Sequence, residues 1–150
     1  MRNYRLALIG FGNVGQGLAQ IIVERGDEIA WQYGAQISVV AVSDKLKGSL
    51  YDPDGLDMKQ LLGASNECTR LEELPAPHHG WNALQTIQNS NADIIAEVSY
   101  TDLNTGQPAT DHIETALRAG KHVITTNKGP IALHYPRLME LARQNNVEIG

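Results

Sequence analysis

Three glycines near the start of the chain are spaced in a way that suits phosphate binding. An apolar run precedes them and a run with helical spacing follows, around the sequence Gly10-Phe11-Gly12-Asn13-Val14-Gly15. In this context the first glycine permits a tight turn, the second lets the backbone approach a pyrophosphate, and the third allows close packing of helix on strand. The phosphate then lies at the positive N-terminus of the helix. The pattern predicts a dinucleotide-binding loop; the alternative is a glycine turn with packing value only.

An acidic residue after the second predicted strand bears on which dinucleotide would bind. Asp44 lies 29 residues beyond Gly15, whereas the usual spacing is about 20 residues. A hydrogen bond from the adenosine ribose hydroxyls to Asp44 would favour NAD, whereas the neighbouring Lys45 and Lys47 would neutralise the 2′-phosphate of NADP. A third interpretation is a solvated aspartate at a strand end. The sequence therefore leaves NAD and NADP both open.

Polar side chains also follow the third and fourth predicted strands. Ser99 and Tyr100 come after one of these strands, and Asn127 and Lys128 come after the other. Because the carboxyl ends of parallel strands face the cofactor in such a sheet, these side chains are candidates for contacts with ribose, carboxamide or substrate. The ammonium of Lys128 would stabilise an oxygen that gains charge during hydride transfer. The alternative for Lys128 is a surface lysine in a turn.

The histidines and the cysteine do not have the spacing of a metal site. His78 and His79 are adjacent in a proline-rich loop, and Cys68 has no Cys-x-x-Cys partner. Separate predicted elements carry the remaining histidines, His112, His122 and His134. We therefore expect no metal and interpret the histidines as solvated or helix-capping residues.

Hydrophobic periodicity places these residues on alternating strands and helices. Apolar runs predict strands at 4–9, 37–42, 94–98, 122–125 and 147–149. Helical spacing predicts helices at 13–26, 57–62, 83–88, 108–120 and 136–146. Gly26 and Gly120 are expected to end helices, and Pro136 is expected to open one. The alternation predicts one α/β domain over residues 1–150, a Rossmann-type, doubly wound, mainly parallel sheet flanked by helices. Trp31 and Trp81 are interpreted as packing residues.

Composition excludes several other classes of protein. The 150 residues carry a formal net charge of −5 and no basic run, which argues against a nucleic-acid binder. No apolar stretch approaches the roughly 20 residues that span a bilayer, and the run at 6–9 is too short for a signal peptide. The single cysteine excludes an intrachain disulfide and favours a reducing cytoplasm. We expect neither a nucleic-acid nor a membrane partner.

Two longer segments, taken together with these motifs, resemble a known family. Residues 97–109 (EVSYTDLNTGQPA) and 116–130 (ALRAGKHVITTNKGP), with the glycine loop and residues 51–57 (YDPDGLD), are similar to the nucleotide-binding half of homoserine dehydrogenase. The resemblance implies a whole enzyme that interconverts L-homoserine and L-aspartate 4-semialdehyde with NAD or NADP. That reaction lies on the route from aspartate to threonine, methionine and isoleucine.

The same resemblance implies roles for individual residues. Backbone groups of Phe11, Gly12, Asn13 and Val14 would hold the pyrophosphate. Ser99 and Tyr100 would border the nicotinamide, and Lys128 would reach the nicotinamide and substrate side. Two positions depart from the family pattern: Thr125-Thr126 stands where Thr-Ala is commoner, and Ser99-Tyr100 stands where many members have Thr-Pro.

Members of this family also carry a second region, which the present sequence lacks. That region supplies the acidic substrate ligands, the main proton-transfer lysine and most subunit contacts. We therefore expect this chain to bind NAD(P) without turning over homoserine, and the full enzyme to be a homodimer or homotetramer. Two alternatives are the cofactor domain of another aspartate-pathway reductase, which explains residues 126–130 less well, and a stand-alone NAD(H)-sensing module. A sensor has no need for a lysine at the nicotinamide end.

Overall fold

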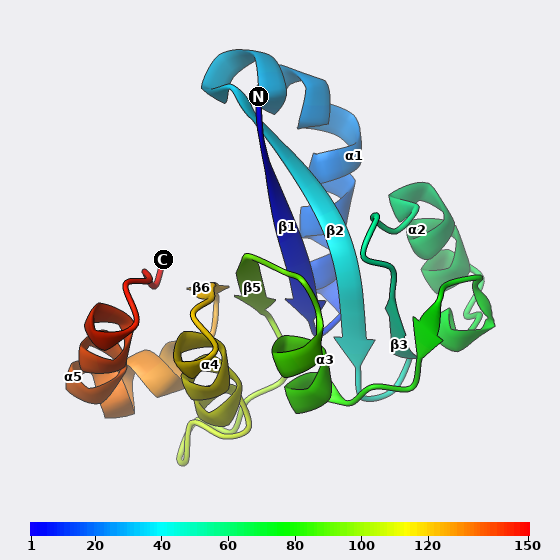
Figure 1. Cartoon of the computed structure of the whole chain (residues 1–150). Helices are drawn as coiled ribbons and strands as arrows, with labels where there is room; N and C mark the ends of the chain where they lie inside the picture. Colours follow the sequence, from blue (N-terminus) through cyan, green and yellow to red (C-terminus); the bar gives the residue numbers. More distant parts are fainter.

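Six strands form one sheet in the computed structural model, which describes all 150 residues (Figure 1). Four of them are parallel and lie side by side, in the order β2 (Ala35–Asp44), β1 (Arg2–Ile9), β5 (Ile94–Glu97) and β6 (His122–Thr125). Beyond β2 the sheet continues with β3 (Gly48–Tyr51), antiparallel to β2, and β4 (His78–His79), antiparallel to β3. The chain moves outward from β1 first to β2 and later, on the other side, to β5. The predicted doubly wound, mainly parallel α/β fold is confirmed, with its switch point between β1 and β5.

Helices cover both faces of this sheet. On one face pack α1 (Asn13–Tyr33) and α2 (Met58–Asn66). On the other face lie α3 (Ala83–Asn89), α4 (Ala109–Arg118) and α5 (Lys128–Gln144) (Figure 1). A short 3-10 helix, η1 (Leu71–Glu73), lies between α2 and β4. None of these helices has both the length and the apolar composition needed to span a membrane.

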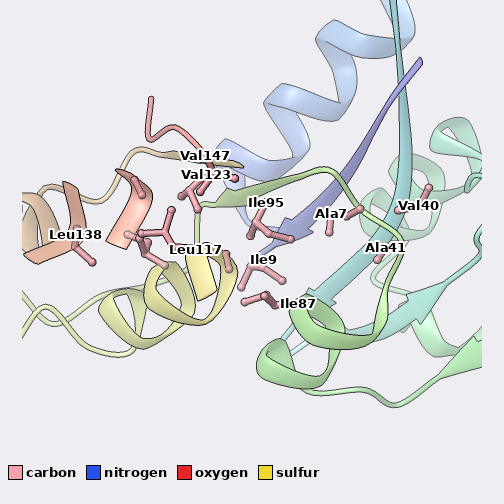
Figure 2. Packing of buried hydrophobic residues seen from close by; sticks show 14 of the residues in the cluster. Ala7, Ile9, Val40, Ala41, Ile87, Ile95, Leu117, Val123, Leu138 and Val147 are labelled. Atoms are coloured by element: carbon pink, nitrogen blue, oxygen red, sulfur yellow. The ribbon is translucent and has the colours of Figure 1, made fainter. Parts of the chain in front are cut away.

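Alternating side chains along β1 divide the core into two layers. Leu6 and Leu8 belong to a cluster of 12 buried residues beneath α1 and α2. Ala7 and Ile9 belong to a cluster of 15 buried residues, which joins the sheet to α3, α4 and α5 (Figure 2). Both faces of the sheet are thus covered, which explains why the parallel strands are apolar on successive residues rather than on alternate ones.

A β-bulge interrupts the register between β1 and β2. Leu6 pairs with Val39 and Ala7 pairs with Ala41, so Val40 is an extra residue in β2. Val40 and Ala41 are therefore both members of the cluster in Figure 2, although they are neighbours in sequence. A bulge bends its strand and increases the local twist. This bend precedes the last residues of β2, which reach the carboxyl edge of the sheet.

The first helix is longer than the sequence predicted. It passes through Gly26 and ends at Tyr33, where Gly34 has a left-handed φ of 64° and donates its N–H to the Ala30 carbonyl. The prediction that Gly26 ends the helix is wrong, because an internal glycine costs only about 1 kcal/mol relative to alanine and does not stop a helix that packs on a sheet. Gly120, with a φ of 72°, follows the end of α4 as predicted.

The last helix, α5, consists of two helical segments that meet at His134, where the backbone is non-helical with a φ of −131°. The first segment starts at Lys128 and was not predicted. Pro136 lies in the first turn of the second segment, in agreement with the prediction that it opens a helix. A proline inside a helix lacks the N–H of one hydrogen bond and clashes with the preceding turn, which is why the helix bends there. The predicted fifth strand at 147–149 pairs in parallel with β6 through a bridge between Ile149 and Val123, where the Val123 N–H donates to the Glu148 carbonyl at 2.9 Å and the Gly150 N–H donates to the Val123 carbonyl at 2.8 Å. This pairing is too short to count as a seventh strand of the sheet.

The two tryptophans have different environments. Trp81 stacks on Tyr51 and on His78, with ring centroids 5.0 Å and 5.2 Å apart, which confirms a packing role. Trp31 is 87% exposed near the end of α1, so the prediction that it is a packing residue is wrong. Trp31 lies in the part of α1 beyond Gly26, which the sequence prediction had not assigned to the helix.

Truncation of a core side chain in α4 should destabilise the fold. Leu117 is fully buried in the cluster of Figure 2. Leu117→Ala should lower the free energy of unfolding by about 2–5 kcal/mol, because it removes buried apolar surface and leaves a cavity. Urea denaturation followed by circular dichroism measures this change. Arg118→Ala, at the next and exposed position, is the control and should change stability by less than about 0.5 kcal/mol; equal effects of the two changes would contradict the assigned core.

Candidate functional site

The glycine loop lies at the carboxyl end of β1, where two backbone segments come into direct contact with it. Gly10 has a φ of +98°, and a Cβ there would lie 2.7 Å from the Val98 carbonyl oxygen and 2.8 Å from the Ser99 nitrogen. A Cβ on Gly15 would lie 2.6 Å from the Gly10 carbonyl oxygen. Both positions therefore require glycine, because α1 and the segment after β5 approach the loop without side chains between them.

Gly12 differs from the other two glycines because nothing in the protein itself requires it. Its φ is −83°, and a Cβ there would meet no atom within 4 Å. Gly12 is the N-cap of α1, no side chain caps this helix, and the first turn contains no acidic residue. The first N–H groups of a helix have no intrahelical partner and carry partial positive charge. Gly12, Asn13 and Val14 are all exposed, so the start of α1 is open to an anion.

Asp44 and Lys47 hold the glycine loop from the side of β2. One carboxylate oxygen of Asp44 accepts a hydrogen bond from the Phe11 N–H at 2.8 Å. The other accepts from the Leu46 and Lys47 N–H groups, at 2.9 and 2.8 Å. Lys47 Nζ donates to the Phe11 carbonyl at 2.8 Å, and Gln16 Nε2 donates to the same oxygen at 2.9 Å. The Phe11 ring is fully buried, so the loop is fixed through both its backbone and its side chain.

These contacts bear on what the sequence predicted for Asp44. The interpretation of Asp44 as a solvated aspartate at a strand end is wrong, because three backbone N–H groups donate to its carboxylate. Lys47 is not a free cation, since its ammonium is bound to the loop. Lys45 is exposed. The hydrogen bond by which Asp44 holds the glycine loop could not be predicted from the sequence, because Asp44 and Phe11 are 33 residues apart.

On the other side of β1, Ser99 and Asn127 come together at the ends of β5 and β6. Asn127 Nδ2 donates to the Ser99 carbonyl at 3.0 Å and to Glu97 Oε1 at 2.9 Å. The Asn127 N–H donates to Thr125 Oγ1 at 3.0 Å, and that hydroxyl donates to the Glu97 carbonyl at 2.9 Å. Because the Ser99 backbone also lies against Gly10, the segments after β1, β5 and β6 form one continuous edge.

Two residues of this region were missed by sequence reasoning. Glu97 is fully buried, and its Oε2 lies 2.6 Å from His112 Nδ1. The prediction that His112 is solvated or caps a helix is wrong: it is 8% exposed and faces the sheet from α4. Two signals were available in the sequence. Glu97 is a charged residue at the end of an apolar strand, and His112 precedes Ile113 on the buried face of its helix.

The remaining predicted residues, Tyr100 and Lys128, are exposed. Tyr100 is 84% exposed, beside Ser99. Lys128 is the first residue of α5, where a cation is unfavourable because the helix N-terminus is itself positive. Lys121, seven residues earlier, is buried instead; it donates to the Ile87 and Ser90 carbonyls at 2.5 and 2.7 Å, and burial lowers its pKa. The two lysines of this segment thus differ: Lys121 fastens the end of α3, and Lys128 is available to a ligand.

Comparisons with known proteins agree on one family. A family model described as "Homoserine dehydrogenase, NAD binding domain" matches residues 10–150. The NAD(+)-dependent homoserine dehydrogenase of Pseudomonas canavaninivorans is 42% identical over 147 residues, which are 98% of this chain and 42% of that protein. The homoserine dehydrogenase of Methanocaldococcus jannaschii is 32% identical over 142 residues, which are 95% of this chain and again 42% of that protein.

Solved structures agree with these relatives. A hyperthermophilic archaeal homoserine dehydrogenase mutant in complex with NADPH superposes with a TM-score of 0.81 at 25% identity, over 98% of this chain and 43% of that one. Homoserine dehydrogenase from S. aureus gives a TM-score of 0.68 at 28% identity, over 99% of this chain and 32% of that one. The present chain thus spans less than half the length of these relatives. By this match and by its fold, the chain belongs to the homoserine dehydrogenase NAD-binding domain family.

Proposed function

We propose that the dinucleotide lies across the carboxyl edge of the sheet, with its pyrophosphate at the start of α1. Gly12 carries this proposal, because the protein leaves space beside it and leaves the adjoining helix N-terminus uncapped. The backbone of Phe11, Gly12, Asn13 and Val14 holds the phosphates, with Gly10 and Gly15 shaping the turn. The adenosine ribose lies toward Asp44, at the end of β2. The nicotinamide lies over β5 and β6, near Ser99, Tyr100, Asn127 and Lys128.

The whole enzyme interconverts L-homoserine and L-aspartate 4-semialdehyde. When bound, the nicotinamide cofactor supplies the hydride acceptor or donor for this reaction. Lys128 stabilises the substrate oxygen that gains charge as the carbonyl is reduced. Its position supports this role: the side chain is exposed, and no acidic residue in the first turn of α5 neutralises it.

Proton transfer and recognition of the substrate's amino acid group belong to the part of the relatives that this chain does not match. The chain spans 42% of the two curated relatives described above. We infer that the remainder supplies the acidic substrate ligands, the main proton-transfer lysine and most contacts of a cytoplasmic homodimer or homotetramer. The present chain contributes the cofactor site and Lys128.

A side chain at position 12 should block the cofactor without disturbing the fold. Gly12→Val places two methyl groups where the pyrophosphate must approach, so the affinity for NADH should fall more than about tenfold, or 1.4 kcal/mol. Isothermal titration calorimetry with NADH measures this change. Gly17→Val, on α1 and also with no atom within 4 Å of its Cβ, is the matched control. NADH affinity unchanged by Gly12→Val would show that the phosphates bind elsewhere.

We propose NAD(H) as the preferred dinucleotide. The Asp44 carboxylate would repel a 2′-phosphate, and the nearby ammonium of Lys47 is already bound to the Phe11 carbonyl. The chain should therefore bind NADH about tenfold more tightly than NADPH, a difference of roughly 1.4 kcal/mol. Asp44→Asn should bring the two affinities closer together, whereas Asp27→Asn, on the exposed surface of α1, should not. Tighter binding of NADPH by the unaltered chain would refute this preference.

The 150-residue chain alone should bind NAD(H) without oxidising homoserine. The reaction needs a group that removes the hydroxyl proton as hydride leaves carbon, and we assign that group to the unmatched part of the relatives. Absorbance at the NADH band, recorded with NAD and L-homoserine, should not rise above a protein-free blank. A homoserine-dependent increase that disappears in Gly12→Val would contradict this assignment.

A further inference from the structure

Four polar residues, two of them buried and two half-buried, form a hydrogen-bonded network between the carboxyl ends of β5 and β6 and the face of α4. We name them the Glu97 cluster: Glu97, Ser99, His112 and Asn127. Glu97 is fully buried and lies at its centre. It stands on the same side of β5 as Ile95, where the neighbouring residues of α4 are the apolar Ile113 and Leu117.

Every hydrogen bond of the Glu97 carboxylate goes to one of the other three members. Oε1 accepts from the Ser99 N–H at 3.0 Å, from Ser99 Oγ at 2.5 Å and from Asn127 Nδ2 at 2.9 Å. Oε2 pairs with His112 Nδ1 at 2.6 Å. A carboxylate has acceptor sites for all of these partners. The Glu97 carboxylate is thus hydrogen-bonded to the loop after β5 through Ser99, to the loop after β6 through Asn127, and to α4 through His112.

Stability alone does not account for this arrangement. Burying a charged pair is expensive, and apolar residues of similar volume are often neutral or stabilising replacements. An apolar side chain at position 97 would continue the core between Ile95 and Leu117. It would also leave the Ser99 and Asn127 groups without their common acceptor. We therefore attribute the carboxylate at position 97 to the positioning of Ser99 and Asn127, whose donors it accepts.

The cluster sets the orientation of the Asn127 amide. Nδ2 faces two acceptors, Glu97 Oε1 and the Ser99 carbonyl, so the amide nitrogen must point inward and both of its hydrogens are used. Oδ1 then points away from these acceptors. It accepts no hydrogen bond within the protein and is not enclosed, since it is absent from the buried polar atoms that lack a partner. Asn127 thus presents one free acceptor beside Lys128.

We propose that Glu97 is a positioning residue that fixes the Asn127 amide so that Oδ1 accepts a hydrogen bond from the carboxamide N–H of the nicotinamide. The proposal rests on the proposed function, which puts the nicotinamide over the ends of β5 and β6. A primary carboxamide is the one group of that ring that carries an N–H donor. His112 and Ser99 act through Glu97, because they hold its two oxygens in place.

A dinucleotide without this donor tests the proposal directly. In 3-acetylpyridine adenine dinucleotide a methyl ketone replaces the carboxamide, so the ring keeps its shape and loses the N–H. The chain should bind NADH about three- to tenfold more tightly than the reduced analogue, which is the contribution of one neutral hydrogen bond. ADP-ribose, which has no pyridine ring, reports binding of the other half of the cofactor.

Variants of the cluster should abolish this discrimination. Glu97→Ala frees the Asn127 amide to turn, and Asn127→Ala removes the acceptor; in both, the ratio of the two affinities should fall to about one while ADP-ribose binding stays unchanged. The Asn127 side chain caps no N–H of α5, so Asn127→Ala removes no helix cap. This variant therefore tests the acceptor even if Glu97→Ala fails to fold. Glu97→Gln should retain the discrimination, because its amide oxygen can face Asn127 while its nitrogen faces His112. Glu114→Ala, which removes a carboxylate of α4 paired with Arg137, is the control.

The outcomes distinguish failure of the Asn127 proposal from failure of the proposed dinucleotide binding. Failure of the unaltered chain to bind either NADH or ADP-ribose would overturn the proposed function and this inference with it. Binding of NADH and the acetyl analogue with equal affinity would overturn the inference alone. So would a preference for NADH that persists in Asn127→Ala. Loss of the preference in Asn127→Ala and Glu97→Ala, with retention in Glu97→Gln and Glu114→Ala, supports it.

Discussion

The carboxyl edge of the sheet depends on a contact between backbones that leaves no room for side chains. Gly10 lies against the Val98–Ser99 segment, and Gly15 lies against the Gly10 carbonyl. A Cβ at either position would come within 2.6–2.8 Å of backbone atoms, which no rotamer change can relieve. This contact puts the N-terminus of α1 at the switch point between β1 and β5. Since β1 lies between β2 and β5 in the sheet, the uncapped N–H groups of α1 have the end of β2 on one side and the ends of β5 and β6 on the other.

Two carboxylates, one on each side of this contact, hold the loops that surround the helix N-terminus. Asp44 ends β2 and accepts from the Phe11 backbone; Glu97 ends β5 and accepts from Ser99 and Asn127. Each carboxylate stabilises a loop through N–H donors that would otherwise lack a protein partner. The same physical device therefore shapes the adenosine side and the nicotinamide side. The difference lies in burial, since Glu97 is fully enclosed and Asp44 is not.

The lysines and histidines show why residue type alone was a poor guide to role. Lys121 and Lys128 belong to one short segment, yet Lys121 bonds the end of α3 and Lys128 is exposed. Lys121 precedes β6, at the opposite edge of the sheet, whereas Lys128 follows that strand. His112 and His78 carry the same imidazole, but one faces a buried carboxylate and the other stacks on aromatic rings. Their place relative to the sheet, which follows from the direction of each strand and helix, decides these roles.

The sequence by itself determined the alternation of the four parallel strands with helices, the glycine loop and the polar residues at the strand ends. It could do so because helical and strand periodicities, and the steric demands of glycine, are local properties of the chain. The bulge at Val40, the antiparallel strands β3 and β4 and the continuation of α1 past Gly26 were decided by packing on the sheet. So were the pairs Asp44–Phe11 and Glu97–His112, whose members are 33 and 15 residues apart. A hydrogen bond between distant residues depends on how the layers meet, and only the tertiary structure specifies that.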